Sequence, residues 1–172
     1  MRKIVIITGL LFGFVTAVAQ TKTHTDLNIM TFNIRYDNPD DGLNNWKFRK
    51  ESAIKLIRFQ EVDVLGAQEV LSNQLKDMST QLQEYVAIGV GREDGKEKGE
   101  YSPILYKKDK FALIKSGYFW LSETPEKPSK GWDAACERIA TWAQLRDKAT
   151  GKKFFVLNTH FDHIGTVARE ES

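Results

Sequence analysis

Hydrophobic and polar residues along the first half of the chain follow a pattern that predicts alternating strands and helices. Residues 27–34 carry apolar side chains on both alternating faces, which is typical of a strand covered on both sides. The stretch 46–57 then has apolar residues at roughly helical spacing, and the apolar run 62–67 predicts a buried strand. Ser72 is expected to cap a second helix, after which residues 85–90 return as a strand.

The second half of the chain has a different pattern, because strand-like segments follow one another without helices between them. We expect strands at 102–106, 111–121, 139–146 and 154–159, joined as antiparallel hairpins by compact polar connectors. The glycine-rich, charged stretch 89–99 predicts a flexible exposed loop. It lacks the spacing of a phosphate-binding loop, and the next element is again strand-like.

The directions of these strands bring polar side chains to one rim of the predicted sheet. In a hairpin, the start of the first strand and the end of the second lie at the same edge, so Arg138 and His160 are expected to be neighbours. Tyr101 precedes a strand, while Asn33 and Glu69 follow strands, so all five side chains converge. Simpler roles stay open at this point, such as a turn cap for Asn33 or a surface ion pair for Glu69.

A cluster of polar residues follows the last predicted strand. Side chains on an extended strand alternate between its faces, so Asn158, His160 and Asp162 project to one side if the strand persists. A polar loop leaving the sheet would have the same composition. A zinc site made of His160, Asp162 and His163 is a weaker alternative, because alternating residues on one strand cannot all point inward.

Composition agrees with one globular domain and says little about partners. The 172 residues are 41% hydrophobic and 28% charged, which excludes a disordered or multi-span membrane protein. The 25 basic and 23 acidic residues are spread along the chain, so the formal charge of +2 does not imply a nucleic-acid partner. The single cysteine, Cys136, cannot form an internal disulfide.

Residues 1–19 are predicted to be a secretory signal peptide. Two basic residues precede an apolar run from Ile4 to Val18, and the small residues 17–19 supply a cleavage site. The run is short for a membrane span and has no basic stop-transfer flank, so we expect no transmembrane anchor. The mature part, residues 20–172, is expected to be secreted or periplasmic.

Five short motifs occur in order along the chain: Thr-Phe-Asn-Ile-Arg, Gln-Glu, Tyr-Ser-Pro-Ile-Leu-Tyr, Glu-Arg-Ile-Ala-Thr-Trp and Asn-Thr-His-Phe-Asp-His. With them, the chain from about Leu27 onward resembles the endonuclease/exonuclease/phosphatase superfamily, and in particular its secreted bacterial members. The resemblance implies a four-layer α/β sandwich, with two mostly antiparallel sheets packed face to face and helices outside. It also implies divalent-metal-dependent hydrolysis of phosphate esters by in-line attack of water.

The resemblance assigns roles to the residues on the predicted rim. Glu69 looks like the family's metal-binding glutamate, and Asn33 looks like the asparagine beside it that helps to bind the metal and position the phosphate. The implied cofactor is Mg²⁺, or alternatively Mn²⁺. Tyr101 and Arg138 match the phosphate-contacting tyrosine and arginine, and a guanidinium can donate two charge-assisted hydrogen bonds to phosphate. His160 matches the histidine at the phosphate, where as a cation it would stabilise developing negative charge.

Two further residues, Asn158 and Asp162, are expected to orient His160 and to complete the substrate-binding side chains beside Arg138. Several phosphate esters suit this set equally: nucleic acid, a sugar or inositol phosphate, or a lipid head group. No stable protein partner is implied. The alternative from another class is a secreted, non-catalytic module that binds phosphate or carbohydrate on the same fold.

Two late segments of the family do not occur in this sequence. One is a Gly-Asp-Phe-Asn-like segment that positions the nucleophile and metal, and the other is a Ser-Asp-His segment with a second essential histidine. We therefore expect residues 20–172 to be the N-terminal part of one such domain, with the second half missing. On this expectation, the chain by itself lacks activity, because positioned acid-base groups contribute about 10²- to 10⁴-fold each.

Overall fold

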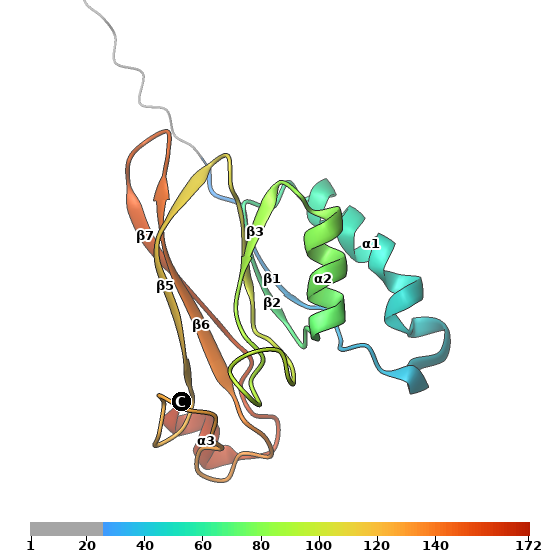
Figure 1. The fold of residues 1–172 in the computed structure, drawn as a ribbon, viewed down its shortest axis with the longest axis vertical. Helices are drawn as coiled ribbons and strands as arrows, with labels where there is room; N and C mark the ends of the chain where they lie inside the picture. Colours follow the sequence, from blue (N-terminus) through green and yellow to red (C-terminus); the bar gives the residue numbers. More distant parts are fainter. Residues whose placement is uncertain (1–25) are drawn as a thin grey trace, which may run out of the picture.

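The computed structural model describes residues 26–172, which form two β-sheets packed face to face (Figure 1). The predicted signal peptide lies outside the described residues. The first sheet has the strand order β1-β2-β4-β3, in which β1 and β2 are parallel and the other neighbours antiparallel. The second sheet is the antiparallel meander β5-β6-β7. The strands are β1 (Ile29–Asn33), β2 (Val64–Gln68), β3 (Tyr85–Ile88), β4 (Ile104–Lys107), β5 (Phe111–Trp120), β6 (Ile139–Asp147) and β7 (Lys153–Thr159).

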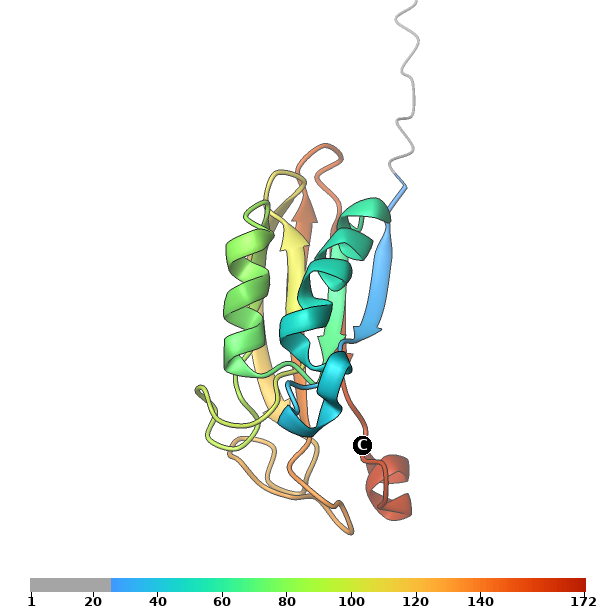
Figure 2. The same cartoon turned by 90° about the vertical axis from the view of Figure 1, so that its right-hand side faces the viewer.

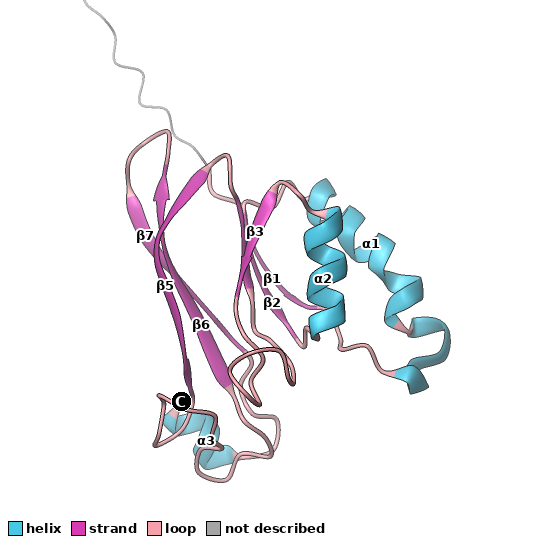
Figure 3. Cartoon of the chain, in the orientation of Figure 1, coloured by secondary structure: helices cyan, strands magenta, loops and turns pink. Residues whose placement is uncertain are grey.

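Two helices cover the outer face of the first sheet, as Figures 2 and 3 show. They are α1 (Trp46–Phe59) and α2 (Ser72–Gln81); a 3₁₀ helix (Pro39–Asn44) precedes α1, and a short helix α3 (Thr166–Glu171) ends the chain. The expectation that Ser72 caps α2 is wrong, because Ser72 is already its first residue and the Gln74 side chain accepts a hydrogen bond from the Leu71 N–H. No helix within residues 26–172 has both the length and the apolar character needed to cross a membrane.

The fold class predicted from the sequence is confirmed, with an α/β sandwich of two mostly antiparallel sheets and helices outside. Within residues 26–172 the helices cover only the first sheet. The outer face of the second sheet carries exposed apolar side chains, including Phe155 and Leu157, which are 68% and 57% exposed.

Apolar residues fill two layers, one on each side of the first sheet. Helices α1 and α2 pack on one face through buried residues such as Trp46, Ile57 and Met78. Between the sheets, Val64 and Ile104 meet side chains of the second sheet, where Phe111 and Phe154 pack edge to face at 5.5 Å. Strand β2 is buried along its whole length because it is central and covered on both faces.

One predicted pairing is wrong. The hairpins β5-β6 and β6-β7 form as expected, but β4 and β5 do not pair, because they belong to different sheets. Both edges of β4 are already occupied by β2 and β3, so the chain after β4 has to begin a new sheet. The polar connector 108–110 joins the two sheets.

The glycine-rich loop between β3 and β4 is not the flexible segment that its composition predicts. Its backbone is closed by hydrogen bonds from Gly91 to Lys96, at 2.9 Å, and from Glu93 to Lys98, at 3.1 Å. The Asp94 carboxylate accepts hydrogen bonds from two backbone N–H groups inside the loop, those of Lys96 and Lys98. The glycines therefore permit a tight, internally bonded loop.

Candidate active site

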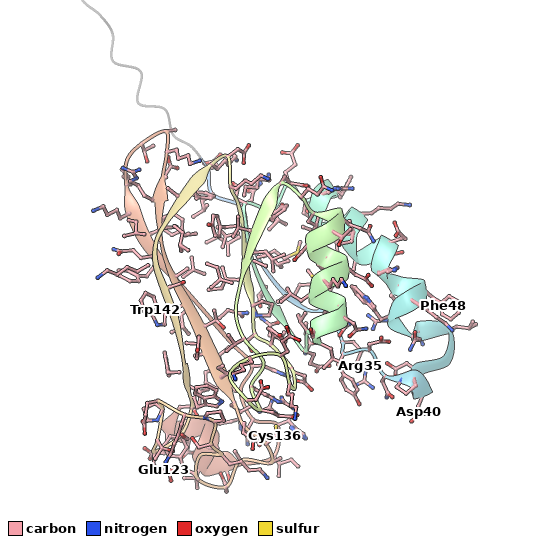
Figure 4. All side chains as sticks on the ribbon, in the orientation of Figure 1. Arg35, Asp40, Phe48, Glu123, Cys136 and Trp142 are labelled. Carbon is pink, nitrogen blue, oxygen red and sulfur yellow. The ribbon has the colours of Figure 1, made fainter. Side chains whose placement is uncertain are left out.

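The residues predicted for the site lie at one end of the sandwich, where β1, β2 and β7 end and β6 begins. Asn33 and Glu69 come from the first sheet, and Arg138 and His160 from the second. In Figure 4 the labelled Cys136, two residues before Arg138, lies at this lower end of the molecule, and the labelled Arg35 follows β1. The two halves of the site are therefore carried on opposite sheets.

Glu69 and Asn33 form a carboxylate–amide pair. The Asn33 Nδ2 donates a hydrogen bond of 2.9 Å to Glu69 Oε1, and the Tyr36 backbone N–H donates one of 3.2 Å to Oε2. The Asn33 Oδ1 accepts a hydrogen bond from the Arg35 backbone N–H. Each carboxylate oxygen of Glu69 thus has one N–H partner and keeps a further lone pair, and Asn33 holds the carboxylate in one orientation.

The backbone at Glu69 is strained. Its φ of 59° lies in the left-handed region, and so does the φ of 60° at Arg35 in the neighbouring segment. Residues with a Cβ rarely adopt this conformation, at a cost of about 1–2 kcal/mol. Such strain concentrates at functional sites, where the surrounding structure imposes it.

Arg138 is the centre of the half-site on the second sheet. Its side chain is buried, and its Nε donates to Asp162 Oδ2 at 3.1 Å. Its Nη1 lies 3.3 Å from His160 Nδ1, and its Nη2 lies 2.9 Å from His163 Nδ1. The predicted contact of Arg138 with His160 is therefore confirmed. The contact with His163 was missed, since the sequence suggested this histidine only as a zinc ligand.

Arginine can only donate hydrogen bonds, so both histidines must accept at Nδ1 and carry their proton on Nε2. Burial, together with the charge of Arg138, lowers the pKa of His160, while the carboxylate of Glu69 opposes this shift. His160 is therefore neutral at pH 7 and offers an Nε2–H donor. A guanidinium has five N–H donors, of which three are used here, so Arg138 keeps two for a ligand.

Asp162 fixes Arg138 and the segment after β7. Burial by itself would raise the pKa of this carboxyl group, but hydrogen bonds from the backbone N–H groups of Gly165 and Ile164 and from Arg138 hold the pKa well below its usual range. The Ala135 N–H donates as well, at 3.1 Å. Asp162 is thus ionised and already surrounded by protein donors, and it orients His160 indirectly through Arg138.

Asn158 is buried between the two sheets. Its Nδ2 donates to the carbonyl oxygens of Ala67 and Pro103, at 2.8 and 2.9 Å, and its Oδ1 accepts from Gln68 Nε2 at 2.7 Å. The expected alternation with His160 fails because β7 ends at Thr159. A Cβ on Gly66 would lie 2.8 Å from Asn158 Oδ1, so this glycine makes room for the amide.

Tyr101 lies next to the site through an isolated bridge to Val70, the residue after Glu69. Its ring is buried in the core under α1 and α2, and burial raises the pKa of its hydroxyl group. That hydroxyl group donates a 3.0 Å hydrogen bond to the carbonyl oxygen of Lys96 in the glycine-rich loop. Contact with phosphate would require it to leave this partner, so the phosphate role of Tyr101 stays a prediction.

The oxygen atoms of Glu69 and Asn33, on the first sheet, suit a hard divalent cation. Glu69 offers carboxylate oxygens with free lone pairs, and Mg²⁺ or Mn²⁺ needs few protein ligands when phosphate and water complete the shell. No group of three or more His, Cys, Asp or Glu residues suited to a metal occurs in the described part of the chain. The zinc alternative does not fit, because His160, Asp162 and His163 direct their acceptor atoms at the Arg138 guanidinium.

The fold and the site together define an α/β sandwich with a carboxylate–amide pair on one sheet and an arginine–histidine cluster on the other. The solved structures similar to this chain include two from Bacteroides. An endonuclease/exonuclease/phosphatase of Bacteroides vulgatus is 55% identical with a TM-score of 0.84, over 86% of this chain and 57% of that one. The mannosyl-6-phosphatase Bt3783 of Bacteroides thetaiotaomicron is 44% identical with a TM-score of 0.83, over 85% of this chain and 55% of that one.

These similarities confirm the predicted resemblance to the endonuclease/exonuclease/phosphatase superfamily. No protein-family model matches the chain. An uncharacterized protein, L388, of Acanthamoeba polyphaga mimivirus is 29% identical over 126 residues, which are 68% of this chain and 46% of that protein. The chain therefore spans about half the length of the relatives that it matches.

Proposed function

We propose that this domain hydrolyses phosphate esters with the help of a divalent cation, Mg²⁺ or Mn²⁺. The observation that carries the proposal is the pairing of opposite ligand types at one end of the sandwich. A carboxylate on the first sheet suits a cation, and on the second sheet Arg138 and His160 keep N–H donors for an anion. The similar Bacteroides thetaiotaomicron protein, a mannosyl-6-phosphatase, supports a phosphate ester as the ligand.

Each residue has a distinct part in this proposal. Glu69 would hold the cation, and Asn33 would keep its carboxylate in position. The cation would polarise a phosphate oxygen and counter charge on the leaving oxygen. Arg138 would donate two N–H groups to the phosphate, and His160 would donate its Nε2–H, so that both counter the charge that develops during in-line attack. Asp162 would keep Arg138 in place.

For the 172-residue chain we expect metal and phosphate binding with slow turnover. In this proposal Glu69, Arg138 and His160 bind and orient, and none of them is assigned the role of activating the attacking water. A positioned general base contributes about 10²- to 10⁴-fold, so turnover without one falls by that factor. Binding is therefore the sharper measurement on this chain.

The test measures Mn²⁺ binding by electron paramagnetic resonance, with and without inorganic phosphate. The wild-type chain should bind Mn²⁺ more tightly when phosphate is present. Glu69→Gln should weaken Mn²⁺ binding by about 100-fold or more, and Asn33→Ala, which removes only a supporting hydrogen bond, by about tenfold. Glu61→Gln, an exposed carboxylate distant from the site, is the matched control and should change nothing.

Turnover of bis(p-nitrophenyl) phosphate, measured with protein in excess, completes the test. Metal-dependent hydrolysis should be lost on chelation and in the Glu69→Gln variant, while the far-UV circular dichroism spectrum is unchanged. Phosphate binding that survives both chelation and Glu69→Gln, without any turnover, would support the non-catalytic binding module instead.

A further inference from the structure

An ion pair in the glycine-rich loop between β3 and β4 has no part in the proposed reaction. Arg92 Nη1 lies 2.8 Å from Glu100 Oε2, and the two side chains are only 15% and 17% exposed. The Arg92 Nε is buried and has no hydrogen-bond partner among residues 26–172. The two ends of the loop are also joined through their backbones, because the Arg92 N–H donates to the Glu100 carbonyl oxygen at 3.1 Å.

This ion pair lies at the end of the sandwich that carries the site. Glu100 directly precedes Tyr101, whose backbone bridges Val70, the residue after Glu69. Figures 1 and 2 both show the loop between β3 and β4 at the lower end of the molecule, toward α3. The charge of Glu100 raises the pKa of His160 and that of Arg92 lowers it, as expected for charges close to the imidazole ring.

The loop is fixed against both sheets. The Trp120 Nε1–H, at the end of β5, donates a 2.7 Å hydrogen bond to the carbonyl oxygen of Arg92. The same indole ring packs against Gly95, where an added Cβ would lie 3.1 Å from it. On the side of the first sheet, Tyr101, whose ring is buried in the core, donates a hydrogen bond from its hydroxyl group to the carbonyl oxygen of Lys96. The Arg92–Glu100 pair is thus held in place before any ligand binds.

The chemistry of the pair favours hydroxyl groups over a second anion. A hydroxyl group both donates and accepts, and a guanidinium beside a carboxylate offers donors and acceptors side by side. The pair is electrically neutral as a unit. A second phosphate group approaching Arg92 would also approach the negative charge of Glu100, which opposes its binding.

We propose that Arg92 and Glu100 bind hydroxyl groups of the ester's alcohol portion, so that the site selects sugar phosphates among phosphate esters. The inference rests on the proposed function, since the phosphate itself is held by Arg138 and His160. Arg92 and Glu100 are specificity residues in this arrangement, because they contact the part of the substrate that does not react.

The experiment compares two phosphate monoesters by isothermal titration calorimetry in the presence of Mn²⁺. Mannose 6-phosphate carries sugar hydroxyl groups, and methyl phosphate has the same phosphate without them. The wild-type chain should bind mannose 6-phosphate more tightly. Arg92→Ala and the near-isosteric Glu100→Gln should each weaken mannose 6-phosphate binding by about tenfold, the effect of one lost hydrogen bond to a charged group, and leave methyl phosphate unchanged.

Lys98→Ala is the matched control, because it removes one positive charge from an exposed side chain of the same loop and should change neither affinity. Equal losses for both ligands in Arg92→Ala and Glu100→Gln, or no loss for either, would overturn the inference. Tighter binding of a sugar bisphosphate than of the monophosphate by the wild type would also overturn it, because Arg92 would then bind a second anion.

The same titrations separate this inference from the proposed function. If Arg138→Met leaves methyl phosphate binding unchanged, the phosphate site itself is wrong and both proposals fall. If Arg138→Met abolishes methyl phosphate binding while Arg92→Ala has no selective effect, only the inference about hydroxyl recognition falls.

Discussion

Asp162→Asn is the substitution that most directly tests how the arginine of the site is held. The Asp162 carboxylate is buried and accepts four hydrogen bonds from N–H groups, two at each oxygen, besides a longer contact of 3.9 Å from Cys136 Sγ to Oδ2. Gly165 and Ile164 donate to Oδ1 at 2.7 and 2.9 Å, and Ala135 and Arg138 donate to Oδ2 at 3.1 Å. Asparagine has the same shape, but its NH₂ group faces two N–H donors whichever way the amide is turned.

The cost follows from these contacts. The substitution removes the charge that compensates a buried guanidinium and leaves at least two donors without an acceptor. Removal of one partner from a buried ion pair costs about 3–5 kcal/mol, and we expect a loss of that size in the free energy of unfolding at pH 7. Most of the loss should be recovered in the Asp162→Asn/Arg138→Met double variant, which no longer buries an unpaired charge.

The pH dependence gives a second, independent signature. The pKa of Asp162 is lower in the folded protein than the value of about 3.9 in the unfolded chain, so the stabilisation by the carboxylate is fully present above about pH 5. It is lost as the pH falls below about 4. The difference in stability between wild type and Asp162→Asn should therefore be constant from about pH 5 to 8 and shrink below, by up to about 1.4 kcal/mol per pH unit.

Urea denaturation followed by tryptophan fluorescence at about pH 7, 5 and 3.5 measures both effects. Asp133→Asn is the matched control, since the exposed Asp133 carboxylate accepts only backbone N–H bonds from α3, including one of 2.8 Å from Ala168. Its effect should be much smaller. A loss in Asp162→Asn no larger than in this control, or one that stays constant down to about pH 3.5, would refute the reasoning.

Three further substitutions test features of the fold near the site. The free energy of unfolding of Glu69→Gly should be about 1 kcal/mol higher than that of Glu69→Ala, because glycine adopts the left-handed backbone conformation without strain. Both variants should lose metal binding. Asn158→Ala should lower the free energy of unfolding by about 2–4 kcal/mol, since it removes the buried donor to the carbonyl oxygens of Ala67 and Pro103; equal stability in urea titrations would contradict this. Gly66→Ala should lower the free energy of unfolding by about 1–3 kcal/mol, and with it the thermal midpoint, because its Cβ would overlap the Asn158 amide. The double variant Gly66→Ala/Asn158→Ala should be destabilised by less than the sum of the two single substitutions.

The sequence predicted the strands well because long apolar runs bounded by polar turns leave few other structures open. The neighbours Arg138 and His160 followed from strand direction alone, since β6 and β7 form a hairpin with Ala140 opposite Thr159. This step needs no knowledge of side-chain contacts, because the rule about hairpin edges concerns only the backbone.

Other features depend on packing between distant segments, which local patterns do not contain. Whether β5 continues the sheet of β4 depends on which edges of β4 are already paired, so the predicted hairpin was wrong. The inward direction of Asn158 depends on the end of β7 at Thr159 and on a glycine at position 66 of the facing sheet. The ordered loop depends on Asp94, whose turn-forming role was hidden by the glycine-rich composition around it.

The three hydrogen bonds of Asn158 also affect the distance between the proposed cation ligand and the proposed phosphate-binding residues. The proposed cation ligand is on the first sheet and the proposed phosphate donors are on the second, so the separation of the two sheets sets the distance across the site. Asn158 joins β7 to residues 67, 68 and 103 immediately behind that site. A core substitution that changes the spacing of the sheets should therefore alter phosphate affinity without touching any residue that binds the ligand.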